Sequence, residues 1–417
     1  MYLFYQIILI VALIVSSPYF LIRAIAGGHG IKERLGFWKF KCDERQVVWF
    51  HAASMGELKA INNILPELIK IRPDLRIIIS TITKTGKNEA IRLFHPVVVF
   101  YLPIDLSCCV KRVLRKLKPS LLVLVETELW PVLISRTAGS GAKISMINAR
   151  LSLKSFKFYR FFKSLFSPAI GKINLVMAQT DDNAGRFIAM GAKPKDVLTA
   201  GNIKFDQVLN LGLTPPDKEL LHYLVHDDKF IFIAGSIWPG EFEAILTSTK
   251  KLLSESNTAR VILAPRHLKN LTKLEEALSR HNIRYIKRSK LTEIERKPDV
   301  MILDTMGELR GLYRYANLAF VGGSLVTVGG HDPLEPASSA CPVCFGPHME
   351  NSKAFTEILV KAGGAFYINN TEELTSLLLK LVHDPQAAKV IGQKAYRAVL
   401  AHSGVSKNIA IKLAELL

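Results

Sequence analysis

Short apolar runs alternate with amphipathic stretches along most of the chain. Apolar runs of about four to eight residues, separated by helical patterns, are typical of parallel strands joined by crossover helices. Residues 58–71 and 108–117 have such a helical pattern. In the first half of the chain, the predicted strands are Val47–Ala52, Arg76–Thr81, Val97–Tyr101, Leu121–Val125, Lys143–Ile147, Leu175–Ala178 and Val197–Ala200.

The alternation lapses around Leu209–Asp228, where Pro215-Pro216 can continue neither a helix nor a strand. A second series follows, and the chain closes with predicted helices at Thr371–Val382 and Gln386–Leu416. We therefore predict two doubly wound, Rossmann-like α/β domains, at residues 26–212 and 213–417. The strands predicted for the second domain are Phe230–Ala234, Arg260–Ala264, Val300–Leu303, Leu318–Val321 and Pro342–Phe345.

Conspicuous motifs follow the predicted strands. Ligands of open α/β sheets bind beyond the carboxyl ends of the strands, so two such domains predict a cleft between these loops. No GxGxxG follows a strand and no Walker A motif occurs, so no dinucleotide cofactor is expected. Neither HExxH nor a Cys/His cluster is present, and we expect no metal. The motifs are HAASMGE (51–57), ETELWP (126–131), NARLS (148–152), GNIKFD (201–206), AGSIWPGE (234–241), APRH (264–267) and DTMGEL (304–309).

The stretch VGGSLVTVGGHDPLEPA (321–337) is the richest of these loops. It places two glycine pairs after a predicted strand, followed by Asp332 as a helix cap and Pro333 at the first helical position. Free N–H groups at such a helix start suit a phosphate, and Glu335 can accept hydrogen bonds from ribose hydroxyls. The alternative is an ordinary capped helix after a glycine turn.

The amino terminus is apolar from Leu3 to Ile22, which is long enough to cross a hydrocarbon core of about 30 Å. Arg23, Lys32 and Arg34 follow it, so the positive-inside rule leaves the body in the cytoplasm. We expect residues 1–25 to anchor the protein without contributing to its chemistry. Ala24-Ile25-Ala26 resembles a signal-peptidase site, and cleavage is the alternative.

The net charge of +19 predicts a polyanionic partner, either nucleic acid or an anionic membrane surface. The apolar amino terminus favours the membrane over nucleic acid. Residues 152–167 (SLKSFKFYRFFKSLFS) predict a helix that interleaves basic and aromatic side chains. This pattern fits a helix at a membrane interface, and it fits equally an ordinary helix with a solvated basic side.

The five cysteines form no disulfide framework, and Cys341-Pro-Val-Cys344 lacks the partners of a redox or zinc site.

Taken together and in this order, the seven motifs other than AGSIWPGE, behind an apolar amino terminus, closely resemble the Kdo (3-deoxy-D-manno-octulosonic acid) transferases of lipopolysaccharide synthesis. The resemblance implies a GT-B fold and an inverting glycosyltransferase. It implies that Kdo moves from CMP-Kdo to the lipid A precursor (lipid IVA) at the cytoplasmic face of the cell inner membrane, with no cofactor beyond the donor.

The resemblance also assigns roles to residues of this chain. The catalytic base corresponds to Glu57, and the positions that stabilise the transition state correspond to Glu126 and Lys204. The family usually has Asn at the position of Asp332 and Asn-Phe at 351–352, which leaves the hydrogen-bonding role of Asp332 open. The CMP contacts correspond to Pro265, Arg266, Met306, Gly307, Glu308, Asp332, Pro333, Leu334 and Glu335.

Alternatives for both the site residues and the function stay open at this point. Glu126 is the rival base, and Glu57 is also what a helix dipole favours in a first turn after Ser54 as N-cap. His51 fits a satisfied histidine at the end of a strand better than a catalytic one. The other functions are a GT-B enzyme with a different nucleotide sugar, and a non-catalytic membrane-anchored anion binder. A non-catalytic anion binder is disfavoured, because it would gain nothing from the carboxylates Glu57 and Glu126 beside its ligand.

Overall fold

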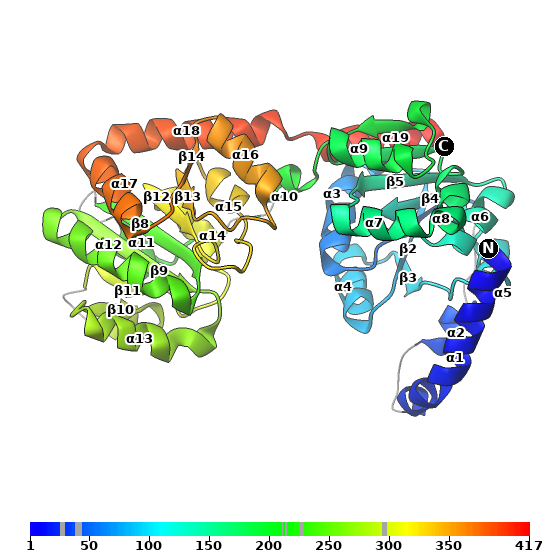
Figure 1. The fold of residues 1–417 in the computed structure, drawn as a ribbon, viewed down its shortest axis with the longest axis horizontal. Helices are drawn as coiled ribbons and strands as arrows, with labels where there is room; N and C mark the ends of the chain where they lie inside the picture. The colour runs from blue at the N-terminus through cyan, green and yellow to red at the C-terminus, as the bar shows by residue number, and fades with distance from the viewer. Residues whose placement is uncertain (26–29, 38–43, 211, 213–214, 226–228, 294–297) are drawn as a thin grey trace. The chain divides into compact units, whose positions relative to one another are not determined.

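In a computed structural model the chain divides into two compact α/β units (Figure 1). The first unit comprises Met1–Gln207 and Ser403–Leu417, and the second comprises Val208–His402. The structure describes every residue except 26–29, 38–43, 211, 213–214, 226–228 and 294–297, and it leaves out the side chains of 16–25 and 292–293.

The first unit contains a parallel sheet of seven strands in the order β3-β2-β1-β4-β5-β6-β7. All seven strands predicted for this half of the chain are confirmed. Between β1 and β4 the direction in which strands are added reverses, and this is where open α/β sheets bind their ligands. The strands are β1 (Val47–His51), β2 (Arg76–Thr81), β3 (Val98–Tyr101), β4 (Leu121–Val125), β5 (Lys143–Ala149), β6 (Leu175–Ala178) and β7 (Val197–Thr199).

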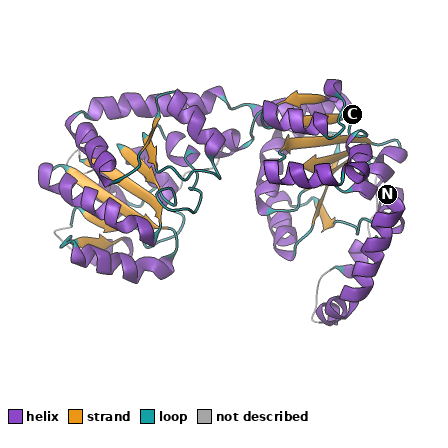
Figure 2. Ribbon diagram, in the orientation of Figure 1, coloured by secondary structure: helices purple, strands orange, loops and turns teal. Residues whose placement is uncertain are grey.

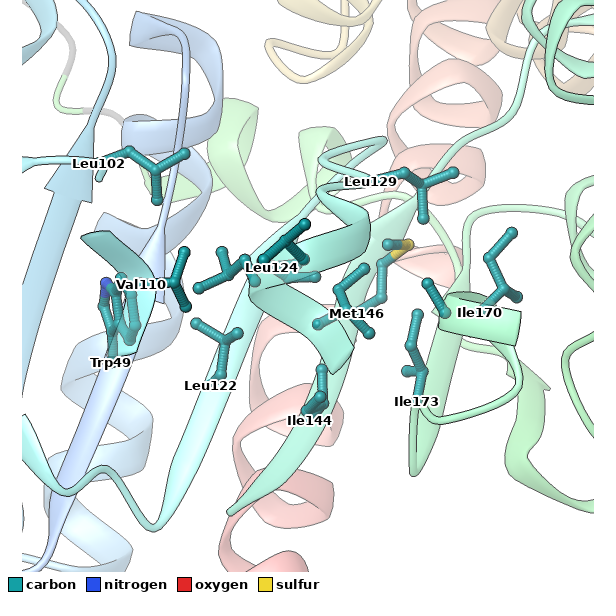
Figure 3. Close-up of a cluster of buried hydrophobic side chains, with 14 of the residues drawn as sticks. Trp49, Leu102, Val110, Leu122, Leu124, Leu129, Ile144, Met146, Ile170 and Ile173 are labelled. Carbon is teal, nitrogen blue, oxygen red and sulfur yellow. The ribbon is translucent and has the colours of Figure 1, made fainter. Parts of the chain in front are cut away.

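Helices cover both faces of this sheet (Figure 2). Successive side chains of a strand point to opposite faces, so Val47 and Trp49 of β1 join one buried cluster while Val48 and Phe50 join the other. Figure 3 shows the first cluster. The helices are α1 (Tyr2–Ile25), α2 (Ile31–Arg34), α3 (Met55–Ile71), α4 (Lys84–Phe94), α5 (Ser107–Leu117), α6 (Pro131–Gly139), α7 (Leu153–Phe161), α8 (Lys163–Ile170), α9 (Asp181–Ala189), α10 (Lys204–Asn210) and α19 (Val405–Leu416).

The second unit repeats the plan with the strand order β10-β11-β9-β8-β12-β13-β14. The five predicted strands are confirmed. The sequence prediction missed the two strands at the edges of the sheet, β10 (Tyr285–Lys287) and β14 (Ala365–Tyr367). Both have only three residues, which is too short for a periodic signal. The others are β8 (Phe230–Ile237), β9 (Ala259–Pro265), β11 (Val300–Ile302), β12 (Leu318–Val321) and β13 (Val343–Phe345).

The reversal point of the second sheet lies between β8 and β12, so the loops after these two strands are neighbours. Buried apolar clusters again lie on both faces of the sheet. The helices are α11 (Lys218–Val225), α12 (Phe242–Glu255), α13 (Leu271–Arg280), α14 (Leu309–Leu312), α15 (Leu334–Ala337), α16 (Lys353–Lys361), α17 (Thr371–His383) and α18 (Pro385–Ala401).

The end of the chain differs from the expected single helix over Gln386–Leu416 and from a second domain running to residue 417. Two helices occur, because Gly404 adopts a left-handed conformation (φ 86°) between α18 and α19. Asp206 accepts hydrogen bonds from the backbone N–H groups of Gly404 and Ser406 (2.6 and 2.5 Å). The apolar face of α19, which includes Ile409, then packs in the core of the first unit. The expected boundary at 212/213 accordingly differs from the division between Gln207 and Val208.

One further helix prediction needs correction, and another is not confirmed. The single helix expected over Ser152–Ser167 is divided into α7 and α8 at Phe162, whose backbone leaves the helical region (φ −97°, ψ 31°). At the amino terminus, α1 covers the apolar run. Over the residues that the structure describes, no helix combines the length and the apolar character that crossing a membrane requires. The spanning anchor expected at Leu3–Ile22 is not confirmed.

Candidate active site

Glu57 lies in the first turn of α3, directly beyond the carboxyl end of β1. Ser54 caps this helix, and its hydroxyl donates to Glu57 Oε1 (2.8 Å), while the backbone N–H of Ala53 donates to Oε2 (2.7 Å). The side chain is therefore folded back on the start of its own helix and is 6% exposed. This geometry matches the alternative of a first-turn carboxylate, so geometry alone does not decide its role.

The loop after β4 brings two more carboxylates to the same edge of the sheet. β4 is paired with β1, so Glu126 and Glu128 follow the strand next to the one that delivers Glu57. Glu126 has a left-handed backbone (φ 59°), a conformation that costs a residue with a side chain about 1–3 kcal/mol and is common at functional sites. Glu128 accepts from the indole N–H of Trp130 (2.8 Å) and lies 3.2 Å from Nε2 of His51.

The surroundings of Glu57 change the pKa of its side chain. The pKa of Glu57 is raised to about 7, mainly by burial and to a smaller extent by the negative charges of Glu128 and Glu126. The hydrogen bonds from Ala53 and Ser54 oppose the shift but do not cancel it. A solvent-exposed carboxylate at a helix start would have a lowered pKa, whereas burial reverses the direction of the shift at Glu57. Glu57 is instead poised to exchange a proton near neutral pH.

The other two carboxylates have different environments. Burial raises the pKa of Glu126, while the charges of Arg150 and Lys204 lower it. The pKa of Glu128 is lowered overall, because the hydrogen bonds from His51 and Trp130 outweigh burial. Neighbouring carboxyl groups with diverging pKa values are the usual basis of distinct acid and base roles. Of the three residues that the sequence predicted together, Glu126 acts electrostatically on Glu57, and Lys204 acts on Glu126.

Lys204 starts α10 in a loop that is tied to the end of β5. Its backbone N–H bonds to Oδ1 of Asn202 (3.0 Å), and Asn202 donates to the side chain of Gln179 (3.0 Å). Asn148 adopts a left-handed conformation (φ 48°), and its Oδ1 accepts from the N–H of Ile203 (3.3 Å). These amide contacts explain why NARLS and GNIKFD, more than 50 residues apart, meet at one edge of the sheet.

His51 and Glu128 are the residues whose part the sequence analysis undervalued. His51 is fully buried, with Nδ1 3.0 Å from Oγ of Ser80, as expected for a satisfied histidine at a strand end. Its second nitrogen lies 3.2 Å from Glu128, a residue of the ETELWP motif to which the sequence analysis gave no role. Two carboxylates spaced two apart after a buried strand were the available signal. Burial of the histidine beside them could not be seen from the sequence.

In the second unit a buried carboxylate holds together the loops at the reversal point. Glu241, which follows β8, accepts from the backbone N–H groups of Trp238, Gly323, Ser324 and Leu325 at 2.8–3.0 Å. It is fully buried. Gly322 is required there by close packing, because a Cβ would lie 2.3 Å from the carbonyl oxygen of Ser236. The glycine pair thus serves the contact between two loops, whatever ligand they bind.

The loops after β9, β11 and β12 carry the predicted donor contacts. Pro265 ends β9, and Arg266 and Met306 are exposed. Gly307 has φ 90°, and Glu308 pairs with Arg288 (3.1 and 2.8 Å). A carboxylate so engaged has less capacity left for a ligand.

The predicted helix start after the second glycine pair is only partly found. α15 is a single turn that begins at Leu334, with Pro333, not Asp332, in the cap position. Asp332 Oδ1 nevertheless accepts from the N–H of Leu334 (3.0 Å), so this aspartate serves the backbone of its own chain. Glu335 follows in the turn, and its charge and that of Asp332 act on Arg310.

An aromatic and imidazole group lies beside these loops. The indole N–H of Trp238 donates to Nε2 of His331 (3.1 Å), and the ring of His267 packs edge-on against Trp238, with 5.2 Å between the centroids. Burial lowers the pKa of His331, and the positive charges of Arg266 and His267 lower it further. Basic groups of the APRH and GGHDP motifs therefore gather at one place within the second unit.

Within the described part of the chain, no group of three or more His, Cys, Asp or Glu side chains could hold a metal ion. Cys341 and Cys344 are buried and unpaired. The expectation that the reaction uses no metal stays a prediction.

The model of the family described as 3-deoxy-D-manno-octulosonic-acid transferase (kdotransferase) matches residues 29–207. A 3-deoxy-D-manno-octulosonic acid transferase of Haemophilus influenzae is 31% identical over 382 residues, which cover 91% of this chain and 89% of that protein. A bifunctional glycosyltransferase/methyltransferase of Fusobacterium nucleatum is 32% identical over 340 residues. That match covers 80% of this chain and 52% of the relative, so the chain spans about half the length of that relative.

Among solved structures, a UDP-GlcNAc 2-epimerase from Neisseria meningitidis bound to UDP-GlcNAc matches with a TM-score of 0.61 at 13% identity. The match covers 89% of this chain and all of that chain. At this identity the likeness shows the fold alone, two parallel-sheet α/β domains of the GT-B type. The identity to the Haemophilus protein, over nine tenths of both sequences, shows more: the chain belongs to the family of 3-deoxy-D-manno-octulosonic acid (Kdo) transferases, which are glycosyltransferases.

Proposed function

We propose that this chain transfers Kdo from CMP-Kdo to a hydroxyl group of the lipid A precursor in lipopolysaccharide core synthesis, with inversion at the anomeric carbon. The observation that carries the mechanism is the position of Glu57 in a cluster of three carboxylates, where burial, with a smaller contribution from the half-buried Glu128 and Glu126, raises its pKa to about 7. A base of that pKa is half deprotonated at neutral pH and still strong enough to accept a proton from a reacting hydroxyl.

The transfer assigns one task to each member of the cluster. Glu57 takes the proton of the acceptor hydroxyl as the hydroxyl oxygen attacks the anomeric carbon from the face opposite CMP. Glu126, whose own charge is balanced by Arg150 and Lys204, stabilises the positive charge that develops on the sugar. Glu128, already bonded to His51 and Trp130, keeps the loop in place and adds to the negative charge around the base.

Donor binding belongs to the second unit in this proposal. Arg266 pairs with the CMP phosphate, and Glu335 accepts from the ribose hydroxyls. Pro265, Met306, Gly307, Glu308, Asp332, Pro333 and Leu334 complete the nucleotide contacts that the family implies. CMP-Kdo is an activated donor, so the proposal includes no cofactor and no metal.

Membrane contact is proposed for two surfaces of the first unit. The exposed side of α1 carries Leu3, Phe4, Ile7, Val11 and Ile14. On α7, Phe158 and Phe161 are exposed among the basic side chains of Lys154, Lys157 and Arg160. Aromatic and basic groups side by side suit an interface with anionic headgroups. We propose the cytoplasmic face of the cell inner membrane as the location, where α7 meets the lipid that carries the acceptor.

The proposed reaction is tested by incubating the purified chain with lipid A precursor and CMP-Kdo and reading the product by mass spectrometry. We expect a mass increase of one or more Kdo residues, and none with UDP-GlcNAc as the donor. Glu57→Gln should lower turnover by about 10²–10⁴ at saturating donor, because glutamine keeps the cap but cannot take a proton. Glu67→Gln, on the same helix α3, is the matched control. Near-normal turnover of Glu57→Gln would remove Glu57 from the mechanism, and transfer from UDP-GlcNAc alone would replace the proposed donor.

Arg266→Ala should weaken CMP binding by about tenfold to a hundredfold, because a charge-assisted contact to phosphate is worth roughly 1.5–3 kcal/mol. The side chain is exposed, so the variant should fold normally. Calorimetric titration with CMP measures the change, with Lys269→Ala, an exposed cation shortly after it, as the control. An unchanged CMP affinity would exclude Arg266 from the donor site.

Phe161→Ser should weaken binding to phosphatidylglycerol vesicles about tenfold or more, because burying a phenylalanine side chain stabilises by roughly 1.5–3 kcal/mol. Phe161 is 83% exposed, so its replacement leaves the fold intact. Vesicle co-sedimentation measures the change. Phe161→Trp should retain binding, and Ile188→Ser, an exposed apolar position on α9, should not alter it. Equal binding by all three variants would show that α7 does not contact the membrane.

A further inference from the structure

Asp105 is a buried carboxylate that the proposed reaction does not use. It lies between β3 and α5, is 3% exposed and accepts three hydrogen bonds. Two come from the start of α6, where the N–H groups of Val132 and Leu133 donate to Oδ2 (3.0 Å) and Oδ1 (2.7 Å). The third comes from α1, where the phenol of Tyr5 donates to Oδ2 (3.1 Å). Asp105 thus joins the amino-terminal helix to the first turn of α6.

The start of α6 directly follows the loop Glu126–Trp130, which carries two of the three carboxylates of the proposed active site. Pro131 is its first residue, and Trp130, in the cap position, makes no side-chain capping hydrogen bond. The exposed N–H groups of a helix start need acceptors, and Asp105 supplies them from elsewhere in the chain. Trp130 donates in turn to Glu128, whose charge raises the pKa of Glu57. A contiguous set of contacts therefore connects Asp105 with the carboxylate cluster.

The first two turns of α1 are built into the first unit. Tyr2 and Tyr5 pack against its core, and Ser135 of α6 donates to the hydroxyl of Tyr2 (3.0 Å). Gln6 accepts from the N–H of Ser107 at the start of α5 (3.0 Å). Positions 2, 5 and 6 share one face of a helix. The expectation that residues 1–25 contribute nothing beyond anchoring overlooked these three polar side chains in the apolar run.

The charges of Asp105 and Tyr5 at neutral pH follow from the directions in which their pKa values are shifted. Burial raises the pKa of Asp105 to about 6, while the three donors oppose that shift. Burial and the charge of Asp105 raise the pKa of Tyr5. At neutral pH, Tyr5 is therefore a neutral donor to a carboxylate, which is among the stronger kinds of hydrogen bond in proteins.

We propose that Asp105 is a positioning residue through which the first two turns of α1 hold the loop Glu126–Trp130 in its active arrangement. Attachment of α1 thereby supports the rate of transfer and not only the location of the enzyme. This inference rests on the proposed function of Glu57 and Glu126. It assigns no role in donor binding to α1.

Tyr5→Phe tests the inference, because it removes one hydroxyl and keeps the packing of the ring. We expect kcat to fall about three- to tenfold, with the KM for CMP-Kdo and the affinity for CMP unchanged. Tyr2→Phe is the matched control, since it removes a phenol hydroxyl from the same face of α1 without touching Asp105, and it should stay within about twofold of the parent. Equal losses in both variants would indicate general destabilisation and overturn the inference.

A double-mutant cycle separates positioning from a structural role. Trp130→Phe removes the indole N–H that reaches Glu128, and if Tyr5 acts through the same loop, the losses in kcat should not multiply in the double variant. Independent losses would contradict the inference.

Amide hydrogen exchange gives a readout that does not depend on transfer. In Tyr5→Phe the amides of Val132 and Leu133 should exchange faster, while those of α9 should not change. Unchanged exchange at Val132 and Leu133 would overturn the inference even in an active enzyme. An absence of transfer by the unaltered chain would overturn the proposed function instead, and the exchange result would still decide whether α1 holds the loop.

Discussion

The gathering of one buried and two half-buried carboxylates at one point of the first sheet is the constraint on which the proposed chemistry depends. The order β3-β2-β1-β4 places the loop after β1 next to the loop after β4, although 70 residues of chain separate them. The negative charges of Glu126 and Glu128 therefore act on Glu57, and little water is present to screen this interaction. Each has a different set of partners, and the differences move their pKa values apart. The second unit has the same topology, and there Glu241 holds together the loops at the reversal point of the sheet.

The structure supports this cluster from several directions. His51 and Trp130 hold Glu128, and the amide contacts of Asn148 and Asn202 bring Lys204 to the same edge. Asp105 supplies acceptors to α6, whose first turn follows the loop Glu126–Trp130. The apolar amino terminus is connected to this support through Tyr5. The amino-terminal helix α1 and the loop that contains Glu126 and Glu128 thus share one buried carboxylate.

Much of this was predictable from the sequence because local patterns carry it. Continuous apolar runs such as Leu121–Val125 identify buried parallel strands, and the residues that follow them must lie at the carboxyl edge of a sheet. Partners distant in the sequence were less accessible. Nothing local to Gly404 predicts that α19 returns to the first unit, and nothing in WPGE shows that Glu241 will be buried beneath the glycine loop. The contacts of Tyr2, Tyr5 and Gln6 were not predicted, because the amino terminus was judged by its overall apolar character. The helical spacing of these three residues was nevertheless visible in the sequence.

The central claim, that burial and the neighbouring carboxylates together raise the pKa of the proposed base Glu57, is tested most directly by the pH dependence of transfer at saturating donor. The carboxylate is the active form, so the rate should fall about tenfold per pH unit below a midpoint near 7 and level off above it. The midpoint belongs to the coupled cluster and not to one group. Glu128→Gln removes one neighbouring charge and should move the midpoint to lower pH. A rate that stays constant between about pH 5.5 and 8, or a midpoint that Glu128→Gln leaves unchanged, would contradict the account.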